Sequence, residues 1–144
     1  MADIDLDRKM TEAEARNLAP LTLAFYGDSV YEQMVRRTLV LTADMKVQDL
    51  HNMAVAMVCA SFQARVSKYI ASMLTPDELY YFNRGRNSSH IGVPRSSTSA
   101  EYRAATGLEA LFGYLDITGQ TERAKAIFLI IRNFHEMEVK RRGR

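Results

Sequence analysis

The chain has 144 residues, a single cysteine, no long apolar run and no stretch with the alternating pattern of a β-strand. One cysteine, Cys59, excludes an intrachain disulfide and a zinc site built from cysteines. No apolar run approaches the length of a membrane span, and the acidic N-terminus MADIDLDRKM lacks the apolar stretch of a signal peptide. These absences predict a cytoplasmic protein with no membrane partner.

The composition is that of an ordinary globular chain, with 47% hydrophobic and 25% charged residues. The length predicts one domain over residues 1–144, with flexible tails at 1–10 and 140–144. The net charge of +2 permits an anionic partner without requiring one. Basic residues gather at Arg84, Arg86 and Arg95 and in the final KRRGR, where a solvated terminus is the simpler explanation.

Apolar residues recur at helical spacing along almost the whole chain, which predicts an all-α bundle of about six or seven helices. Capping boxes, prolines at first helical positions and terminal glycines mark the helix ends. Helices are predicted to begin near Thr11, Pro20, Thr75, Thr98 and Thr121, with a further break at Ser61.

The segment RGRNSSHIGVPRSS, residues 84–97, has no helical spacing. Gly85, Gly92 and Pro94 interrupt it, and the preceding helix is predicted to end near Arg84 and Gly85. The segment is therefore predicted to be a polar, basic loop, the one part of the chain with the composition of a binding loop.

The stretch LAFYGDSVYE places Gly27 and Asp28 inside a predicted helix that runs from Pro20 to about Thr42. Asp28 falls on the same helical stripe as Ala24 and Val35, so it is predicted to face packed residues rather than water. An isolated carboxylate there is costly, so it needs a cation, a metal or several hydrogen-bond donors.

The stretch TGLEALFGYLD repeats this arrangement, with Glu109 among small residues that include Gly113. Glycines let two helices approach closely, so Asp28 and Glu109 are predicted to meet at a shared point. Two convergent carboxylates suit Mg²⁺, which keeps several of its waters. The pattern equally allows each acid to pair with an arginine, for example Arg36 or Arg103.

These two stretches, in this order, resemble the two signature motifs of ribonuclease III catalytic domains. The RGRN segment followed by Pro94 and Arg95 is similar to the compact bacterial subgroup, Mini-III ribonuclease, which is the catalytic domain alone. The resemblance implies a homodimer that hydrolyses double-stranded RNA, with Mg²⁺ (or Mn²⁺) held by the catalytic residues Asp28 and Glu109. It further implies 5′-phosphate and 3′-hydroxyl products and a role in maturing 23S ribosomal RNA.

The chain departs from ordinary ribonuclease III at Leu21, Ala24 and Thr106, where the family has further acids. The resemblance therefore implies a reduced metal site. With no double-stranded-RNA-binding domain implied, RNA binding is assigned to Arg84, Arg86, Asn87 and Arg95. Glu32 follows Asp28 by one turn, and a surface ion pair with Arg36 explains it better than metal binding.

The missing acids leave an alternative of a different class, a non-catalytic RNA-binding or ribosome-associated module on the same fold. The retention of both Asp28 and Glu109 favours the enzyme, because buried acids would not help a module that only binds phosphates. The sequence contains no nucleotide-cofactor motif, and its histidines, His51, His90 and His135, have no partner at helical spacing for a metal site.

Overall fold

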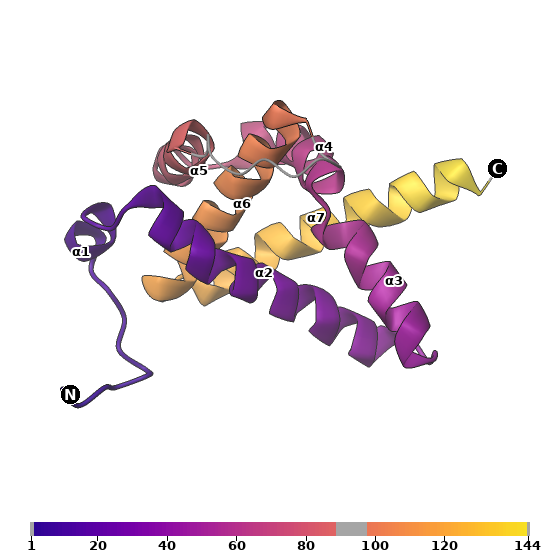
Figure 1. Cartoon of the computed structure of the whole chain (residues 1–144), viewed down its shortest axis with the longest axis horizontal. Helices are drawn as coiled ribbons and strands as arrows, with labels where there is room; N and C mark the ends of the chain where they lie inside the picture. The colour runs from indigo at the N-terminus through magenta and orange to yellow at the C-terminus, as the bar shows by residue number, and fades with distance from the viewer. Residues whose placement is uncertain (1, 89–97, 144) are drawn as a thin grey trace.

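The computed structural model describes residues 2–88 and 98–143, and within them every regular element is a helix (Figure 1). The predicted all-α fold class is confirmed. The elements in chain order are α1 (Glu12–Arg16), α2 (Pro20–Thr42), α3 (Val47–Val58), α4 (Ala60–Ile70), the 3₁₀ turn η1 (Ala71–Met73), α5 (Pro76–Ser88), α6 (Ser99–Ile117) and α7 (Thr121–Arg142). No helix in the described ranges is long and apolar enough to cross a membrane.

Helix α6 lies at the centre, with α2, α4 and α5 packed around it (Figure 1). Residues 105–115, apart from Glu109, are buried. A helix that is apolar on nearly all sides must be covered on nearly all sides, so the composition of α6 dictates its position. The one acid in this stretch is therefore held by the core of the molecule.

Glycines allow α2 and α5 to approach α6 closely. A Cβ added to Gly113 of α6 would lie 2.1 Å from the Leu23 carbonyl oxygen of α2. A Cβ added to Gly107 would lie 2.8 Å from the Phe82 carbonyl oxygen of α5. No larger residue fits at either crossing without separating the helices, which confirms the close approach predicted from the sequence.

Several predicted helix ends are confirmed. Thr11 and Thr98 form capping boxes with Glu14 and Glu101, and α2 has the predicted limits. Gly119 follows the cap of α6 with a φ of 81°.

Other predicted ends are wrong. The break between α3 and α4 falls at Cys59, whose extended backbone ends one helix and begins the next, while Ser61 lies inside α4. Helix α5 continues past Gly85 to Ser88, because that glycine serves the contact with α6 instead of ending the helix. The predicted start of the last helix near Thr121 is confirmed, but its cap position is Gln120, so Thr121 does not cap it.

The two predicted tails differ in structure. Residues 2–10 precede the first helix, and their end is fixed where the Met10 amide donates to the Ile117 carbonyl at 2.7 Å. At the other end α7 continues through Arg142, so the basic run prolongs a helix. Positive side chains in a last turn complement the helix dipole, which favours this continuation.

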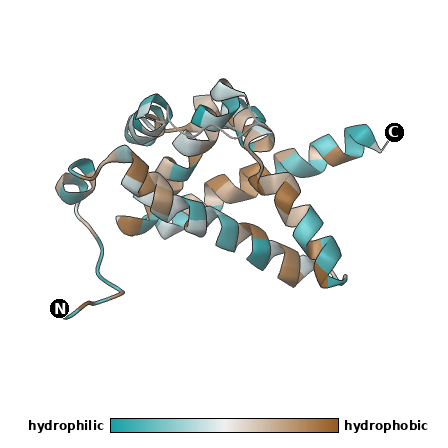
Figure 2. Ribbon diagram, in the orientation of Figure 1, coloured by the Kyte–Doolittle hydropathy of each residue, from teal (hydrophilic) through white to brown (hydrophobic). Residues whose placement is uncertain are grey.

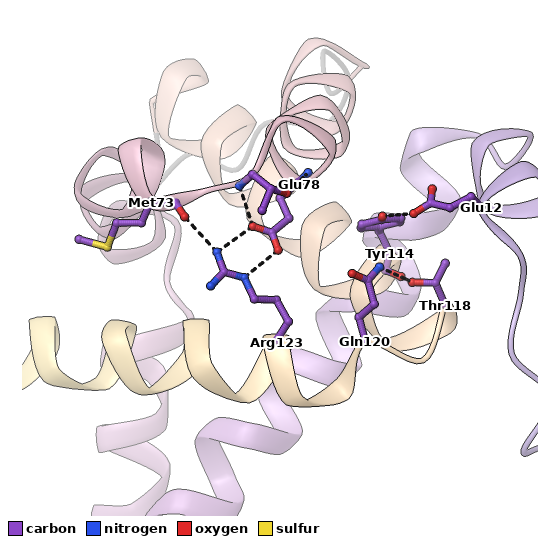
Figure 3. Close-up of polar contacts among 8 residues, drawn as sticks. Glu12, Met73, Glu78, Tyr114, Thr118, Gln120 and Arg123 are labelled. Atoms are coloured by element: carbon purple, nitrogen blue, oxygen red, sulfur yellow. Dashed lines mark hydrogen bonds and ion pairs between the residues drawn. The ribbon is translucent and has the colours of Figure 1, made fainter.

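An ion pair with a buried carboxylate joins the start of α5 to α7 (Figure 3). The Arg123 guanidinium donates to both carboxylate oxygens of Glu78, at 2.8 and 2.9 Å, and to the Met73 carbonyl at 2.9 Å. Burial alone would raise the pKa of Glu78, but the hydrogen bonds from Arg123 and from the Thr75 amide outweigh it and lower that pKa. The pair therefore fixes α7, which has limited contact with α6, against the rest of the bundle.

A second polar contact in Figure 3 anchors α1. The hydroxyl of the buried Tyr114 donates to the carboxylate of Glu12, and its ring stacks on that of Tyr81 at 3.8 Å between centroids. Helix α1 is too short to be stable alone, and this contact holds it against α6.

Candidate active site

The α2–α6 crossing brings Asp28 and Glu109 together. The Glu109 side chain lies within hydrogen-bonding reach of the Asp28 carboxyl and is mostly shielded from water. Asp28 itself is exposed, so the prediction that it faces packed residues is wrong. The physical reason is that Gly27, not residue 28, sits at the point of contact with α6, which leaves Asp28 at the rim of the crossing.

The two acids share one electrostatic environment. Burial, then the charge and hydrogen bond of Asp28, and finally the charge of Glu32, raise the pKa of Glu109 to about 8. Without a cation, Glu109 therefore holds a proton at neutral pH. A group that must lose this proton to hold a positive ion is a candidate functional residue on physical grounds.

The structure distinguishes the two explanations that the sequence left open. In the described ranges neither Asp28 nor Glu109 forms an ion pair with a lysine or arginine. Arg36 pairs with Glu32 at 3.2 Å, which confirms the surface ion pair expected there. Arg103 lies elsewhere on α6, so the acids face each other rather than arginines.

The donor set fits a hydrated divalent cation. Two carboxylates with one exposed side are a common way to hold Mg²⁺, which retains several waters and takes further oxygens from phosphate. The described residues contain no cluster of three or more acidic, histidine or cysteine side chains with the geometry of a metal site. Leu21, Ala24 and Thr106 contribute no carboxylate, and the Thr106 hydroxyl donates to the Tyr102 carbonyl at 3.0 Å.

The predicted RNA-binding residues occupy different environments. Arg84 is half-buried in α5, where its guanidinium donates to the Arg16 and Leu18 carbonyls at 3.3 and 3.4 Å. Arg86 and Asn87 are exposed in the last turn of α5, on a helix rather than in the predicted loop. Arg95 lies outside the described residues, as do Ser89 and His90.

Sequence reasoning missed one contact that positions α2. The Tyr26 hydroxyl, two residues before Asp28, donates to the carboxylate of Asp116 near the end of α6. This hydrogen bond, with partial burial, raises the pKa of Tyr26 to about 12. The partners are 90 residues apart, and neither has a local pattern that would have identified the pair.

Two acids that meet where two helices cross form a candidate metal site, and comparison with known proteins specifies the family. The profile of the Ribonuclease III domain matches residues 21–120. The chain therefore belongs to the ribonuclease III family, and it is a hydrolase, an endoribonuclease. This family acts on double-stranded RNA and generally depends on divalent metal ions.

Individual relatives cover most of the chain. The Mini-ribonuclease 3 of Symbiobacterium thermophilum is 41% identical over 127 residues, which cover 88% of this chain and 98% of the relative. The Mini-ribonuclease 3 of Clostridium tetani is 30% identical, covering 96% of this chain and 92% of the relative. A crystal structure of a protein from Fusobacterium nucleatum, 30% identical, has a TM-score of 0.76 and covers 85% of this chain and 98% of its own.

Proposed function

We propose that the protein is a Mg²⁺-dependent endoribonuclease that cleaves double-stranded RNA in the maturation of 23S ribosomal RNA in the cytoplasm. The observation that supports this most strongly is the Asp28–Glu109 pair in a chain of the ribonuclease III family. The products carry 5′-phosphate and 3′-hydroxyl ends, and Mn²⁺ substitutes for Mg²⁺ because it accepts the same oxygen ligands.

Asp28 and Glu109 have different tasks in this proposal. Asp28, exposed at the rim of the crossing, presents its carboxylate on the side from which a phosphate approaches. Glu109, mostly shielded from water, would hold the cation with Asp28 once its own carboxyl is deprotonated. A bound divalent ion supplies Lewis acidity, lowering the pKa of an attacking water and stabilising charge on the phosphate. The α2–α6 crossing fixes the two carboxylates before substrate arrives, so little reorganisation is needed.

Arg86 and Asn87 are proposed to contact the RNA backbone from the exposed end of α5. Duplex RNA is recognised mainly through phosphates and 2′-hydroxyls, which a guanidinium and an amide both bind. Arg95, which lies outside the described residues, is also proposed to contact the RNA backbone. Arg84 contributes indirectly, because its guanidinium is engaged with backbone carbonyls near the end of α1.

The protein is proposed to act as a homodimer. Phe25, three residues before Asp28, is 82% exposed, and further apolar side chains are exposed along α2 and α3, where Figure 2 shows brown segments. These further side chains are Val40, Leu41, Val47 and Val55. Exposed apolar groups gathered on neighbouring elements indicate an interface, and a two-fold dimer matches the two-fold relation between the strands of a duplex.

The cleavage proposal is tested with a labelled RNA duplex, in Mg²⁺ and in EDTA, using wild type, Asp28→Asn, Glu109→Gln and the control Glu122→Gln. Glu122 is exposed on α7, and among the described residues its ion-pair partner is Lys125. We expect metal-dependent cleavage that falls at least about a hundredfold in the first two variants and is unchanged in the control. Near wild-type cleavage by either site variant, with its helicity retained, would overturn the assignment.

The same assay tests the alternative of a non-catalytic RNA-binding or ribosome-associated module. The residues that favour it are Leu21, Ala24 and Thr106, which replace the further acids of ordinary ribonuclease III. Binding of the duplex without cleavage in Mg²⁺ or Mn²⁺ would support the module. A precursor 23S RNA, compared with an unrelated duplex of equal length, then tests the proposed substrate.

A further inference from the structure

A cleft of ≈ 680 Å³ lies between α4, α5 and the first turns of α6, and no step proposed for Asp28 and Glu109 uses it. Arg103, on its wall, precedes Glu109 by six positions, a rise of about 9 Å along the helix. The two residues also leave the helix in directions about 120° apart, so the cleft is separate from the acid pair. Its described lining residues are Ala64, Ser67, Lys68, Ala71, Phe82, Arg86, Asn87, Thr98, Ala100, Glu101, Arg103 and Ala104.

The lining combines an apolar floor with a cationic rim. Alanines from α4 and α6 and the ring of Phe82 supply the apolar part. Lys68, Arg86 and Arg103 contribute positive charge from three different helices. In the described ranges Lys68 and Arg103 form no ion pair, and both are exposed.

The one acid among the described lining residues is already engaged. Glu101 accepts a hydrogen bond from the Thr98 amide at 2.9 Å as part of the capping box of α6. Its carboxylate therefore stabilises the start of the helix, and the cations around the cleft outnumber it. Asn87, also on the wall, has an amide that can both donate and accept.

We infer that this cleft binds one nucleoside monophosphate unit, with its phosphate at the rim of Lys68 and Arg103 and its base over the apolar floor. A bare phosphate would leave the apolar floor unused, and an uncharged apolar ligand would leave the cations unused. A mononucleotide matches both parts, and the volume is in the range of small-molecule sites.

The inference rests on the proposed function for the origin of this unit, which is an unpaired nucleotide of the RNA substrate. A paired base inside a duplex is stacked and cannot enter a cleft, whereas a nucleotide in a bulge or overhang can be splayed out and bound. The cleft therefore favours substrates with an unpaired nucleotide over fully paired ones.

Isothermal titration calorimetry in EDTA, where no cleavage occurs, measures binding of AMP, adenosine and inorganic phosphate separately. We expect AMP to bind about tenfold or more tightly than either fragment. Lys68→Ala and Arg103→Ala should each weaken AMP binding at least about fivefold, whereas Lys125→Ala, an exposed lysine on α7, should not. Ala100→Leu, at an exposed helical position on the cleft wall, should obstruct binding while preserving the fold.

The source of the nucleotide is distinguished with uncleaved RNA duplexes in EDTA, one blunt and one with a single unpaired nucleotide. We expect Lys68→Ala and Ala100→Leu to reduce affinity for the second duplex more than for the first. An equal loss for both overturns the RNA origin, leaving free mononucleotide as the ligand. The assignment of the cleft as a nucleotide site is overturned if AMP does not bind at about 10 mM. It is also overturned if Lys68→Ala and Lys125→Ala change AMP affinity equally. Failure of this binding leaves the cleavage assay of the acid pair unaffected.

Discussion

A Cβ atom on Gly27 would lie 1.6 Å from the backbone carbonyl oxygen of Glu109. The glycine beside one acid therefore touches the backbone of the other, and the separation of the two carboxylates depends on this contact. The same Cβ would lie 2.5 Å from the Gly113 backbone nitrogen, so no rotation of a side chain can relieve the overlap.

Gly27→Ala is expected to destabilise the fold by about 3 kcal/mol or more, because the helices must separate to admit a methyl group. Urea unfolding followed by circular dichroism measures the loss. The control is Gly143→Ala at the end of α7, where the nearest atom to a new Cβ is 3.5 Å away. Equal stability of both variants would show that the crossing tolerates a methyl group and does not fix the acid pair.

Glu109 is expected to make the metal-free protein less stable as the pH rises from 5 to 8. Its pKa is about 8 when folded, against about 4.3 when unfolded, so the folded state binds the extra proton between those values. The stabilisation that protonated Glu109 gives the folded state is complete below the pKa of the unfolded state. It is lost as the pH rises through the pKa of the folded state. The slope is at most about 1.4 kcal/mol per pH unit for one proton.

Glu109→Gln, unfolded in urea across this pH range in EDTA, measures that contribution, because glutamine cannot titrate. The variant should lose most of the pH dependence between pH 5 and 8 that wild type shows. Glu122→Gln, at an exposed carboxylate, should behave like wild type. If wild type and Glu109→Gln follow parallel curves, Glu109 does not hold a proton at neutral pH.

Mg²⁺ is expected to stabilise the protein against heat more at pH 8 than at pH 6. At the lower pH the ion must displace the proton held by Glu109, and binding to the folded state alone raises stability by mass action. Differential scanning fluorimetry with and without Mg²⁺ measures the shift. Asp28→Asn should abolish the shift at both pH values, and a shift retained in this variant would place the ion elsewhere.

The sequence was sufficient to predict the fold because its signals are local. The Thr98 capping box and Pro20 each fix a helix start through residues within one turn, and α6 shows its central position by its composition. The prediction that Gly85 ends a helix is wrong for the same reason. Its function is to let α5 approach α6, and the neighbours that require a glycine there lie more than 20 residues further along the chain.

The site was predictable only in part. The pairing of Asp28 with Glu109 followed from two similar helical patterns, each an acid next to a glycine. The exposure of Asp28 did not follow, because it depends on the angle at which α6 crosses α2, which no local pattern encodes. The Tyr26–Asp116 contact and the cleft beside Lys68 depend on elements that only the folded chain brings together.

Arg84→Ala is expected to lower stability by about 1 kcal/mol rather than to remove an RNA contact. Its guanidinium donates to the Arg16 and Leu18 carbonyls and lies 5.4 Å from the centre of the Tyr80 ring, and a hydrogen bond of this kind contributes about that amount. The logarithmic salt dependence of RNA affinity should keep its wild-type slope. A slope reduced by about 1 would instead identify Arg84 as a phosphate contact.

Arg123→Met is expected to destabilise the protein by about 3 kcal/mol, because it leaves the Glu78 carboxylate buried without its cation. The side chain of Glu78 is only 4% exposed, whereas that of Arg123 is 36% exposed, so the cost falls on the acid. Because the pKa of Glu78 is lower in the folded state than in the unfolded state, its ionised carboxylate stabilises wild type at pH values above the unfolded pKa. This stabilisation is lost as the pH falls through the folded pKa. Thermal unfolding at pH 4 and pH 7 should therefore show that Arg123→Met destabilises the protein less at the lower pH, where the unpaired carboxyl becomes neutral.

Arg132→Met, which breaks an exposed pair with Glu136 on α7, is the matched control and should cost less than about 1 kcal/mol. A similar loss in both variants would mean that the Glu78–Arg123 pair does not hold α7 against α5.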